Sequence, residues 1–202
     1  MNAAIDNVYA IVLAAGASSR MGSPKQLLEW RNRPLLEHAV VNARAVLSER
    51  VIVVLGAQAE AVQASLDLNA VTAVVNPDWQ QGMAASIRAG IRALPDSTAA
   101  ALILLCDQPL INAGHLQKLL DVRQNEPERI VASYYLDSVG VPALFPADYF
   151  ELLLALEGDR GAKPLLMKFE KELVKVALPE AVVDIDVSGD IERLTAVILA
   201  TT

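Results

Sequence analysis

The fold is decided by a stretch near the start of the chain, Leu13-Ala14-Ala15-Gly16-Ala17-Ser18-Ser19-Arg20-Met21-Gly22-Ser23-Pro24-Lys25. It follows an apolar run, Tyr9 to Leu13, of the length expected for a buried strand. Small residues after such a strand let backbone N–H groups approach an anion closely, and Arg20 and Lys25 add positive charge. The stretch therefore predicts a strand that leads into a phosphate-binding loop.

Outward from this stretch, short apolar runs alternate with longer segments of helical period, which is typical of βαβ units around a mostly parallel sheet. Further strands are predicted at 50–55, 72–75, 100–105 and 130–135, with helices at 34–47, 57–66, 83–94 and 113–123. Beyond residue 140 we expect an edge strand at 141–145, interrupted by Pro142, a helix at 147–156, strands at 173–177 and 182–186, and a last helix at 190–199. No linker or repeat divides the chain, so we expect residues 1–202 to form one α/β domain.

Composition excludes several classes of protein. The chain has 202 residues, of which 53% are hydrophobic, and a formal net charge of -7. Such a chain can bury a core, and it lacks the basic patches of a general nucleic-acid binder. No apolar stretch reaches the roughly 18 residues that a membrane span requires. The lone Cys106 permits no internal disulfide, so a reducing cytoplasm is the expected location.

The first loop must be distinguished from two well-known phosphate loops. A Walker loop has four residues between its glycines and then Gly-Lys-Ser/Thr, whereas five residues separate Gly16 from Gly22 and Ser-Pro-Lys follows. A dinucleotide-binding strand is followed by Gly-x-Gly-x-x-Gly, and an acidic residue ends the second strand; this chain has neither. A loop that holds a nucleoside triphosphate remains, and its alternative is a surface loop with solvated charges.

Carboxylates follow two of the predicted strands. Asp107 comes directly after the strand at 100–105, where ligands bind in an open parallel sheet, and a divalent metal is the usual partner of such a carboxylate beside phosphates. The alternative role for Asp107 is an N-cap for the next helix. Asp184 and Asp186 share one face of the predicted strand at 182–186, so one of them is a candidate second ligand, and the other, or Ser188, a candidate helix cap.

Small residues line one flank of the predicted helix at 83–94. Ser86 and Gly90 are four residues apart, so a flat base or ribose has room there; close packing of the helix on the sheet is the alternative. His38 and His115 have no spaced metal partner, and we interpret them as structural or solvated residues. We interpret Cys106 as a small core residue.

Five motifs in this order resemble the MobA-like nucleotidyltransferases, particularly the molybdenum cofactor cytidylyltransferases. They are Leu13-Ala14-Ala15-Gly16-x-Ser18-x-Arg20-Met21-Gly22-x-Pro24-Lys25, Asn76-Pro77-x-Trp79-x-x-Gly82-x-x-x-Ser86-Ile87-x-x-Gly90, Asp107-Gln108-Pro109, Leu156-x-Gly158-Asp159-x-Gly161-Ala162 and Asp184-Ile185-Asp186. The Ala-Ala-Gly turn resembles the cytidylyl members, whereas guanylyl relatives usually have Ala-Gly-Gly there.

The resemblance implies a three-layer, Rossmann-like nucleotidyltransferase fold and transfer of CMP from CTP to the phosphate of molybdopterin, with release of pyrophosphate. It also implies Mg²⁺ as the cofactor and a molybdoenzyme as a candidate client. By this resemblance the metal is bound by Asp107 and Asp186, and the catalytic residues are Arg20, Lys25 and Asp107. The residues that bind the nucleotide are Leu13, Ala14, Ala15, Gly16, Arg20, Lys25, Gly82, Ser86 and Asp107.

The sequence also departs from the family pattern. Gly140-Val141-Pro142 stands where members often have Gly-His-Pro, on the acceptor side, and Asp186-Val187-Ser188-Gly189-Asp190 replaces the common Asp-Thr-Pro-Glu-Asp. Pro24-Lys25-Gln26 resembles the methylerythritol cytidylyltransferases, but their Asp-Ala-Ala-Arg-Pro segment is absent. The alternatives are a guanylyl enzyme or one with another phosphorylated acceptor, a non-catalytic nucleotide-binding protein, and an oxidoreductase.

Overall fold

The chain forms a seven-stranded sheet with the strand order β5-β4-β1-β6-β8-β7-β9. The computed structural model describes residues 7–18, 23–187, 189–192 and 194. The strands are β1 Val8–Ala14, β4 Val51–Leu55, β5 Thr72–Val75, β6 Ala100–Leu105, β7 Val131–Tyr135, β8 Ser138–Pro146 and β9 Val174–Ala177. Only β8 runs antiparallel to its neighbours, so the sheet is mixed but mostly parallel, which confirms the expected α/β class.

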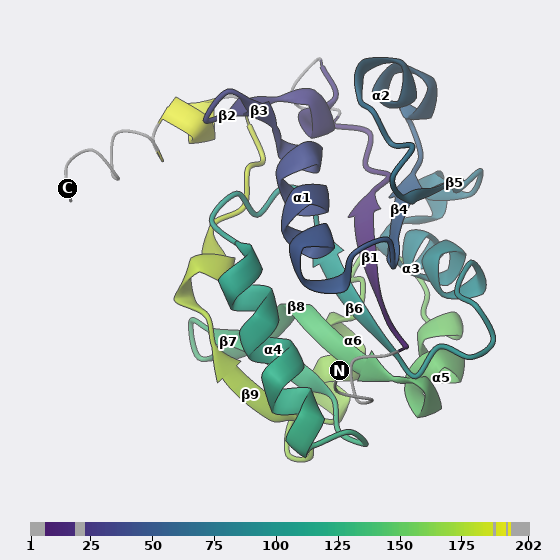
Figure 1. Cartoon of the computed structure of the whole chain (residues 1–202), viewed down its shortest axis with the longest axis vertical. Coiled ribbons are helices and arrows are strands. Elements are labelled where there is room, and N and C mark those ends of the chain that lie inside the picture. The colour runs from purple at the N-terminus through teal and green to yellow at the C-terminus, as the bar shows by residue number, and fades with distance from the viewer. Residues whose placement is uncertain (1–6, 19–22, 188, 193, 195–202) are drawn as a thin grey trace.

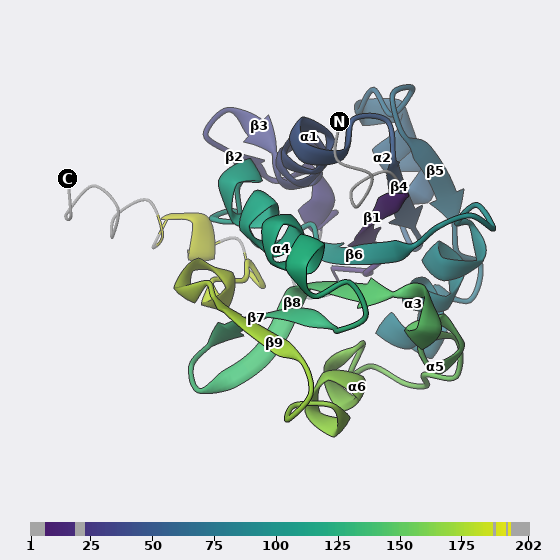
Figure 2. The same cartoon turned by 60° about the horizontal axis from the view of Figure 1, so that its bottom comes forward.

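Helices cover both faces of this sheet (Figures 1 and 2). They are α1 Leu35–Leu47, α2 Ala59–Ser65, α3 Met83–Arg92, α4 Ala113–Asn125, α5 Phe150–Leu154 and α6 Lys163–Lys168. Apolar side chains of α1, α2 and α4 pack on one face, and those of α3, α5 and α6 pack on the other. The three layers expected from the resemblance are therefore present.

The sequence pattern explains this layering. Every residue of β4 is buried, as expected for a strand with helices on both sides. Alternate residues of β1 serve the two faces: Val12 packs with α1, and Ile11 packs with α3. In α1 the buried residues recur at the spacing of one helix face, at Leu36, Val40, Ala43 and Leu47.

The prediction of an edge strand at 141–145 was wrong. The segment belongs to β8, which pairs with β6 on one side and β7 on the other. Pro142 is tolerated inside the sheet because the register with β7 shifts: Ala132 faces Ala143, the next residue, Ser133, faces Gly140, and Pro142 has no ladder partner. The hydroxyl of Ser133 donates to the carbonyl of Pro142 at 2.6 Å, which satisfies both buried groups.

The strand predicted at 182–186 is also absent. A 3₁₀ turn, Pro179–Val182, is followed by residues without regular structure, because Ile185 N–H donates to the carbonyl of Asp107 instead of joining a ladder. Of the last predicted helix, residues 190–192 and 194 are helical, and the rest lies outside the described residues.

Several short elements were not predicted. They are the 3₁₀ turns Lys25–Leu27 and Trp79–Gln81, the hairpin of β2 Glu29–Trp30 and β3 Arg33–Pro34, and α6. The helix predicted at 147–156 begins as the 3₁₀ turn Ala147–Tyr149 and continues as α5. Within the described residues, no helix is long and apolar enough to cross a membrane.

Candidate functional site

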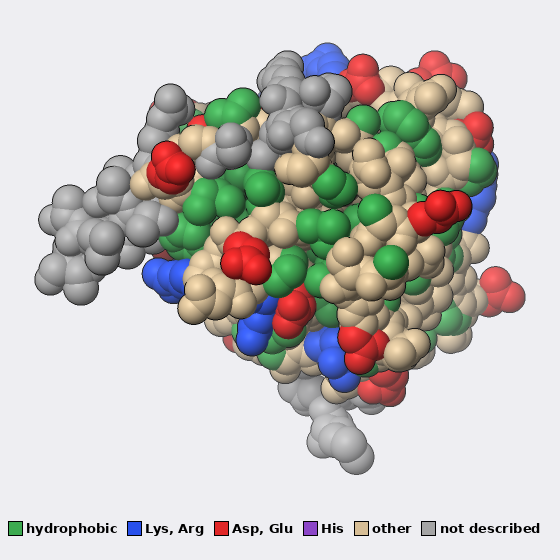
Figure 3. Space-filling view, turned by 90° about the horizontal axis from the view of Figure 1, so that it is seen from above, with side chains coloured by type: hydrophobic (Ala, Val, Ile, Leu, Met, Phe, Trp, Pro, Cys, Tyr) green, Lys and Arg blue, Asp and Glu red, His purple; other side chains and the backbone are tan. Residues whose placement is uncertain are grey.

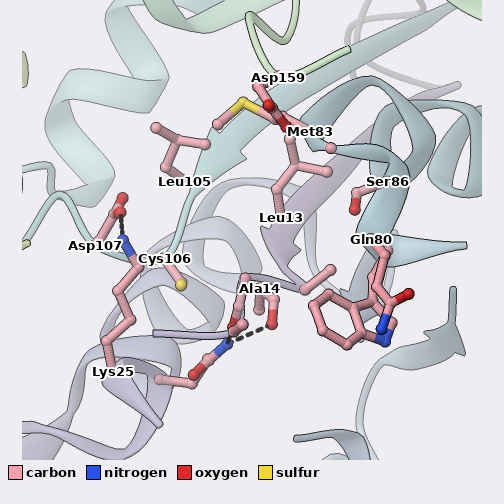
Figure 4. A pocket seen from close by; sticks show the side chains of 16 residues that line it. Leu13, Ala14, Lys25, Gln80, Met83, Ser86, Leu105, Cys106, Asp107 and Asp159 are labelled. Carbon is pink, nitrogen blue, oxygen red and sulfur yellow. Dashed lines mark hydrogen bonds and ion pairs between the residues drawn. The ribbon is translucent and has the colours of Figure 1, made fainter. Parts of the chain in front are cut away.

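A cavity of about 350 Å³ opens at the carboxyl edge of the parallel strands, beside the ends of β1 and β6 (Figure 4). It is lined by Leu13, Ala14, Ala15, Gly16, Ala17, Lys25, Gln26, Trp79, Gln80, Gly82, Met83, Ser86, Leu105, Cys106, Asp107 and Asp159. Figure 3 looks onto this edge of the molecule, where hydrophobic side chains and backbone fill most of the centre. The charged residues of the cavity lining are Lys25, Asp107 and Asp159.

The loop after β1 is held open by Gln26. The Gln26 side chain is 1% exposed, and its amide donates to the carbonyls of Ala14 at 2.7 Å and Gly16 at 3.0 Å. Among the described residues, no acceptor is found for the N–H groups of Gly16 and Ala17. With the carbonyls engaged by Gln26, this loop can present N–H groups to an anion, as the sequence predicted.

Lys25 stands between two carboxylates. Its ammonium is hydrogen-bonded to Asp107 and lies 3.8 Å from Asp186 Oδ1. Burial alone would lower the pKa of Lys25, but the negative charge of Asp107, its hydrogen bond and the more distant Asp186 raise it above 10.5. Lys25 is therefore a permanent cation at the cavity wall.

The carboxylates near Lys25 suit a divalent cation. Asp107 Oδ1 is buried without a hydrogen-bond partner among the described residues, while Oδ2 contacts Lys25. The Asp186 carboxylate lies near the same ammonium, with Oδ1 3.8 Å from Lys25 Nζ. The described residues contain no group of three metal-ligating side chains, so a cation here would need phosphate oxygens or water as further ligands.

Asp184 lies near the same carboxylates, and part of the residue is exposed. Desolvation by its immediate neighbours, together with the charges of Asp107 and Asp186, raises the pKa of Asp184 to about 6. Loss of solvation is the main cause of this shift, and the two neighbouring carboxylates add to it. The N-cap alternative for Asp107 is wrong, because Asn112 caps α4.

The opposite wall is built by α3 and the loop 156–161. Gly82 has φ +95°, and a Cβ there would lie 2.1 Å from Asp159 Oδ1. The loop is fixed by Ala84 N–H, which donates to Gly158 O at 3.0 Å, and by Arg88, which donates to Leu156 O. Gly82 is thus required both by its backbone angle and by this contact.

The two small residues of α3 have different surroundings. Ser86 lines the cavity, whereas a Cβ on Gly90 would lie 2.5 Å from Ile11 Cγ2. Gly90 therefore serves close packing of the helix on the sheet, the alternative that the sequence left open, and only Ser86 belongs to the cavity.

A second cavity of about 160 Å³ adjoins the first and shares Leu13, Met83 and Leu105 with it. Its other lining residues are Ile87, Ile103, Tyr135, Gly140, Val141, Arg160, Ala162, Lys163 and Leu166. Most of this lining is apolar, and Arg160 and Lys163 supply positive charge. The two cavities are thus neighbours that share one wall.

The structure brings together most residues singled out in the sequence. Asp186 lies beside Lys25. The first cavity is lined by Leu13, Ala14, Ala15, Gly16, Lys25, Gly82, Ser86 and Asp107. Arg20 and Ser188 lie outside the described residues. The sequence analysis missed Gln26 and the lining side chain of Asp159; the glutamine after Pro-Lys and the Gly-Asp pair were visible signals for both.

The remaining singled-out residues have structural roles. The pKa of Cys106 is raised to about 12, because burial and the charge of Asp107 outweigh the nearby Lys25. His115 completes the capping box of α4 with Asn112, and His38 contacts the carbonyl of Trp30. These contacts agree with the sequence interpretation.

Comparison with known proteins identifies the family. The model of the MobA-like NTP transferase domain matches residues 10–174. The chain belongs to this family. The match covers β1 to the start of β9 and contains the first loop, Lys25, Asp107 and both cavities; Asp184 and Asp186 lie beyond it. An NTP transferase domain accounts for a loop whose Gly16 and Ala17 N–H groups have no acceptor within the described part of the chain, beside the Lys25 cation.

Proteins with different names are similar to this chain. The chain is 36% identical over 168 residues to "nicotine blue oxidoreductase" of Paenarthrobacter nicotinovorans, covering 79% of this chain and 81% of that protein. It is 37% identical over 117 residues to the bifunctional protein GlmU of Burkholderia orbicola, of which it spans 25%.

Solved structures of the same fold include Rv0371c of Mycobacterium tuberculosis H37Rv. That structure has a TM-score of 0.83 and 31% identity, with 94% of this chain and 98% of that one covered. A complex of Rv0371c with manganese gives a TM-score of 0.79 and 29% identity over 93% and 97% of the two chains.

Proposed function

We propose that this protein is a cytidylyltransferase that transfers CMP from CTP to the terminal phosphate of molybdopterin and releases pyrophosphate. Residues 1–202 would act as one domain, in the cytoplasm, and a molybdoenzyme would be the client of the product. The observation that carries the proposal is the convergence of Lys25 and the carboxylates of Asp107 and Asp186 beside a loop with free N–H groups. The Ala14-Ala15-Gly16 turn supports cytosine as the base.

For nucleotidyl transfer, the protein must mainly position the two substrates and neutralise the charge of their phosphates. The attacking phosphate oxygen is already an anion at neutral pH, so no strong base is needed, and none of the lining side chains is a histidine. The N–H groups of Gly16 and Ala17 would bind the triphosphate, with Arg20 in the same loop. Lys25 would stabilise the charge that develops on the α-phosphate and on the departing pyrophosphate.

Asp107 and Asp186 would hold Mg²⁺ beside Lys25. When bound, this cation would neutralise phosphate charge and fix the geometry of the oxygens. Asp107 is suited to this role because Oδ1 has no other partner among the described residues. Lys25 in turn holds Oδ2 and so orients the carboxylate.

We assign each of the two substrates to one of the two cavities. Ala15, Gly82 and Ser86 would surround the base and ribose in the larger cavity. The acceptor would occupy the smaller one, where apolar side chains can cover a flat ring and Arg160 can meet an anion. Val141, which replaces the histidine common in relatives, lies in this lining and so belongs to acceptor selection.

Pyrophosphate release from each of the four triphosphates, with molybdopterin and Mg²⁺, tests the proposal. CTP should give turnover that stops when EDTA is added. Preference for GTP, or turnover only with another phosphorylated acceptor, would replace the base or the acceptor in the proposal. Metal-dependent CTP binding without turnover on any acceptor would indicate a non-catalytic nucleotide-binding protein.

One observation favours a second candidate function, an oxidoreductase. The relative named nicotine blue oxidoreductase covers 79% of this chain at 36% identity. Against it, β4 ends in Leu55 and Gly56, and a Cβ on Gly56 would lie 2.5 Å from Ala15 O, so no acidic side chain for a dinucleotide ribose stands there. Calorimetric titration with NADH, NADPH and CTP separates the two functions, because only an oxidoreductase should bind a nicotinamide cofactor.

A further inference from the structure

Gln108 is a buried polar residue in the loop after β6, and it is 6% exposed. Its side-chain Nε2 donates to the carbonyl of Ala181 at 2.7 Å and to that of Val141 at 3.4 Å. A carbonyl oxygen can only accept, so these contacts fix which end of the amide is nitrogen. The Asp184 carboxylate also accepts a hydrogen bond from this side chain. Gln108 therefore ties the loop after β6 to the chain segment that follows β9.

The segment 181–186 depends on a few contacts for its place. After the 3₁₀ turn that ends at Val182 it has no regular structure, so no strand ladder holds it. Within the described residues, one backbone hydrogen bond ties it to another element: Ile185 N–H donates to the carbonyl of Asp107 at 3.0 Å. The consecutive residues Asp107 and Gln108 thus hold this segment, the first through its backbone and the second through its side chain.

Asp186 comes directly after the contacts that hold this segment. Its side chain is 66% exposed, and its Oδ1 lies 3.8 Å from Lys25 Nζ. An ion pair of such an exposed carboxylate is weak, so it does not by itself fix the position of Asp186. The backbone N–H of Asp186 donates to Asp190 Oδ2 at 2.9 Å, which is a local contact four residues along the chain. The place of Asp186 beside Lys25 is therefore set mainly by the residues that precede it.

We propose that Gln108 is a positioning residue, which holds the segment 181–186 so that Asp186 can bind the same divalent cation as Asp107. The inference rests on the proposed function, since it assumes that these two carboxylates hold the cation of a nucleoside triphosphate. Gln108 lines neither cavity, so it acts without touching a substrate. Replacing a residue that orients metal ligands through hydrogen bonds typically lowers metal affinity by about 10- to 100-fold.

Gln108→Met tests this role, because methionine has the length of glutamine but cannot donate to Ala181 or Asp184. Calorimetric titration with CTP in excess Mn²⁺, without an acceptor substrate, should show an affinity lower by about tenfold or more. The EPR spectrum of the bound Mn²⁺ is a second readout, because the loss of a carboxylate ligand alters it. Gln108→Asn is a milder second variant: its amide is one methylene too short to keep the contact of 2.7 Å, so the affinity should fall in the same direction.

The double variant with Asp186→Asn separates positioning from a general structural role. If Gln108 acts through Asp186, adding Gln108→Met to Asp186→Asn changes the affinity and the EPR spectrum no further. Arg123→Met is the matched control. Arg123 is also 6% exposed and donates to two backbone carbonyls, those of Pro127 and Ala99, and none of these residues lines either cavity. This variant should be less stable in urea but keep the wild-type affinity for CTP with Mn²⁺.

The outcomes that overturn the inference differ from those that overturn the proposed function. A wild-type chain that binds no nucleoside triphosphate with Mn²⁺, or binds CTP equally well in EDTA, removes the proposed function. A wild-type chain that binds CTP with Mn²⁺, while Gln108→Met and Gln108→Asn keep its affinity and its EPR spectrum, removes only the role of Gln108. A further fall of the affinity in the double variant would show that Gln108 does not act through Asp186.

Discussion

Lys25 illustrates how a single residue depends on its surroundings at this site. The Lys25 side chain is 19% exposed, its ammonium binds a carboxylate of the protein itself, and the residue lines the cavity in which we place the triphosphate. A lysine so placed costs desolvation, which the two carboxylates offset. An arginine would keep the charge but not the compact fit between Asp107 and Asp186.

Lys25→Ala is predicted to lower turnover by more than about a hundredfold, the scale of a lost electrostatic stabiliser. Lys175→Ala is the matched control, because Lys175 pairs with Glu170 on the exposed side of β9. Pyrophosphate release measures both variants, and circular dichroism should show the fold retained in each. Near-normal turnover of Lys25→Ala would contradict the role proposed for this residue.

Cys106 gives a prediction about pH, because the chain has one cysteine. Burial raises the pKa of its thiol from 9.0 to about 12, so between these values the folded state keeps a proton that the unfolded state loses. Its contribution to stability is therefore complete below about pH 9 and declines as the pH rises toward 12. Alkylation by iodoacetamide at pH 8 should be more than about a hundredfold slower in the native protein than in urea. Equal rates would show that the thiol is accessible and normally acidic.

At the scale of elements, the turn before α3 places the wall of the nucleotide cavity. Gly82→Ala should lower the free energy of unfolding by at least about 1 kcal/mol more than Gly158→Ala does, as measured with urea. Both glycines have positive φ, +95° and +74°, but only a Cβ at Gly82 meets other atoms, whereas that at Gly158 meets none within 4 Å. Equal losses would mean that backbone strain, and not the contact with Asp159, explains the glycine.

Elements with strong local signals could be predicted from sequence. The strands β1, β4 and β6 are continuous apolar runs, and α1 and α4 carry helical periods, so their positions follow from local rules. The failures lie where tertiary contacts override local pattern. A proline such as Pro142 favours an edge strand, and only the register shift between β7 and β8 shows why it is tolerated inside the sheet. The sequence of residues 183–186 is typical of a strand, but Ile185 N–H donates to the carbonyl of Asp107 instead.

The candidate site was predictable to a similar extent. Parallel strands end at one edge of the sheet, so the contact of Lys25 with Asp107 follows from topology once both are placed after strands. The approach of Asp186 follows only from a segment that wraps back over the edge. Gln26 was not predictable, because a buried glutamine that binds two carbonyls depends on a loop conformation that no local pattern encodes.

For the whole molecule, ligand binding should appear as added thermal stability. CTP with Mg²⁺, at about 100 times its dissociation constant, is expected to stabilise the fold by about 2.7 kcal/mol, or about 5–10 °C in Tm for a chain of this size. EDTA should remove most of the shift, because the triphosphate would then face Asp107 and Asp186 without a cation between them. A shift with NADH and none with CTP would favour the oxidoreductase instead.

The reversal of chain direction at β8 has a consequence for how such a protein can diversify. The residues of the nucleotide cavity come mainly from positions 13–107, on the parallel side of the sheet, whereas the smaller cavity combines residues of that side with others from β7, β8 and α6. The seam between these halves is the short ladder of β6 and β8, Ala100–Ile103 against Ala143–Pro146, which is built from apolar residues. Substitutions around the smaller cavity can therefore accumulate without disturbing the first loop. In such a fold the acceptor substrate can change during evolution while the nucleotide substrate stays the same. We therefore expect relatives of this fold to carry different names.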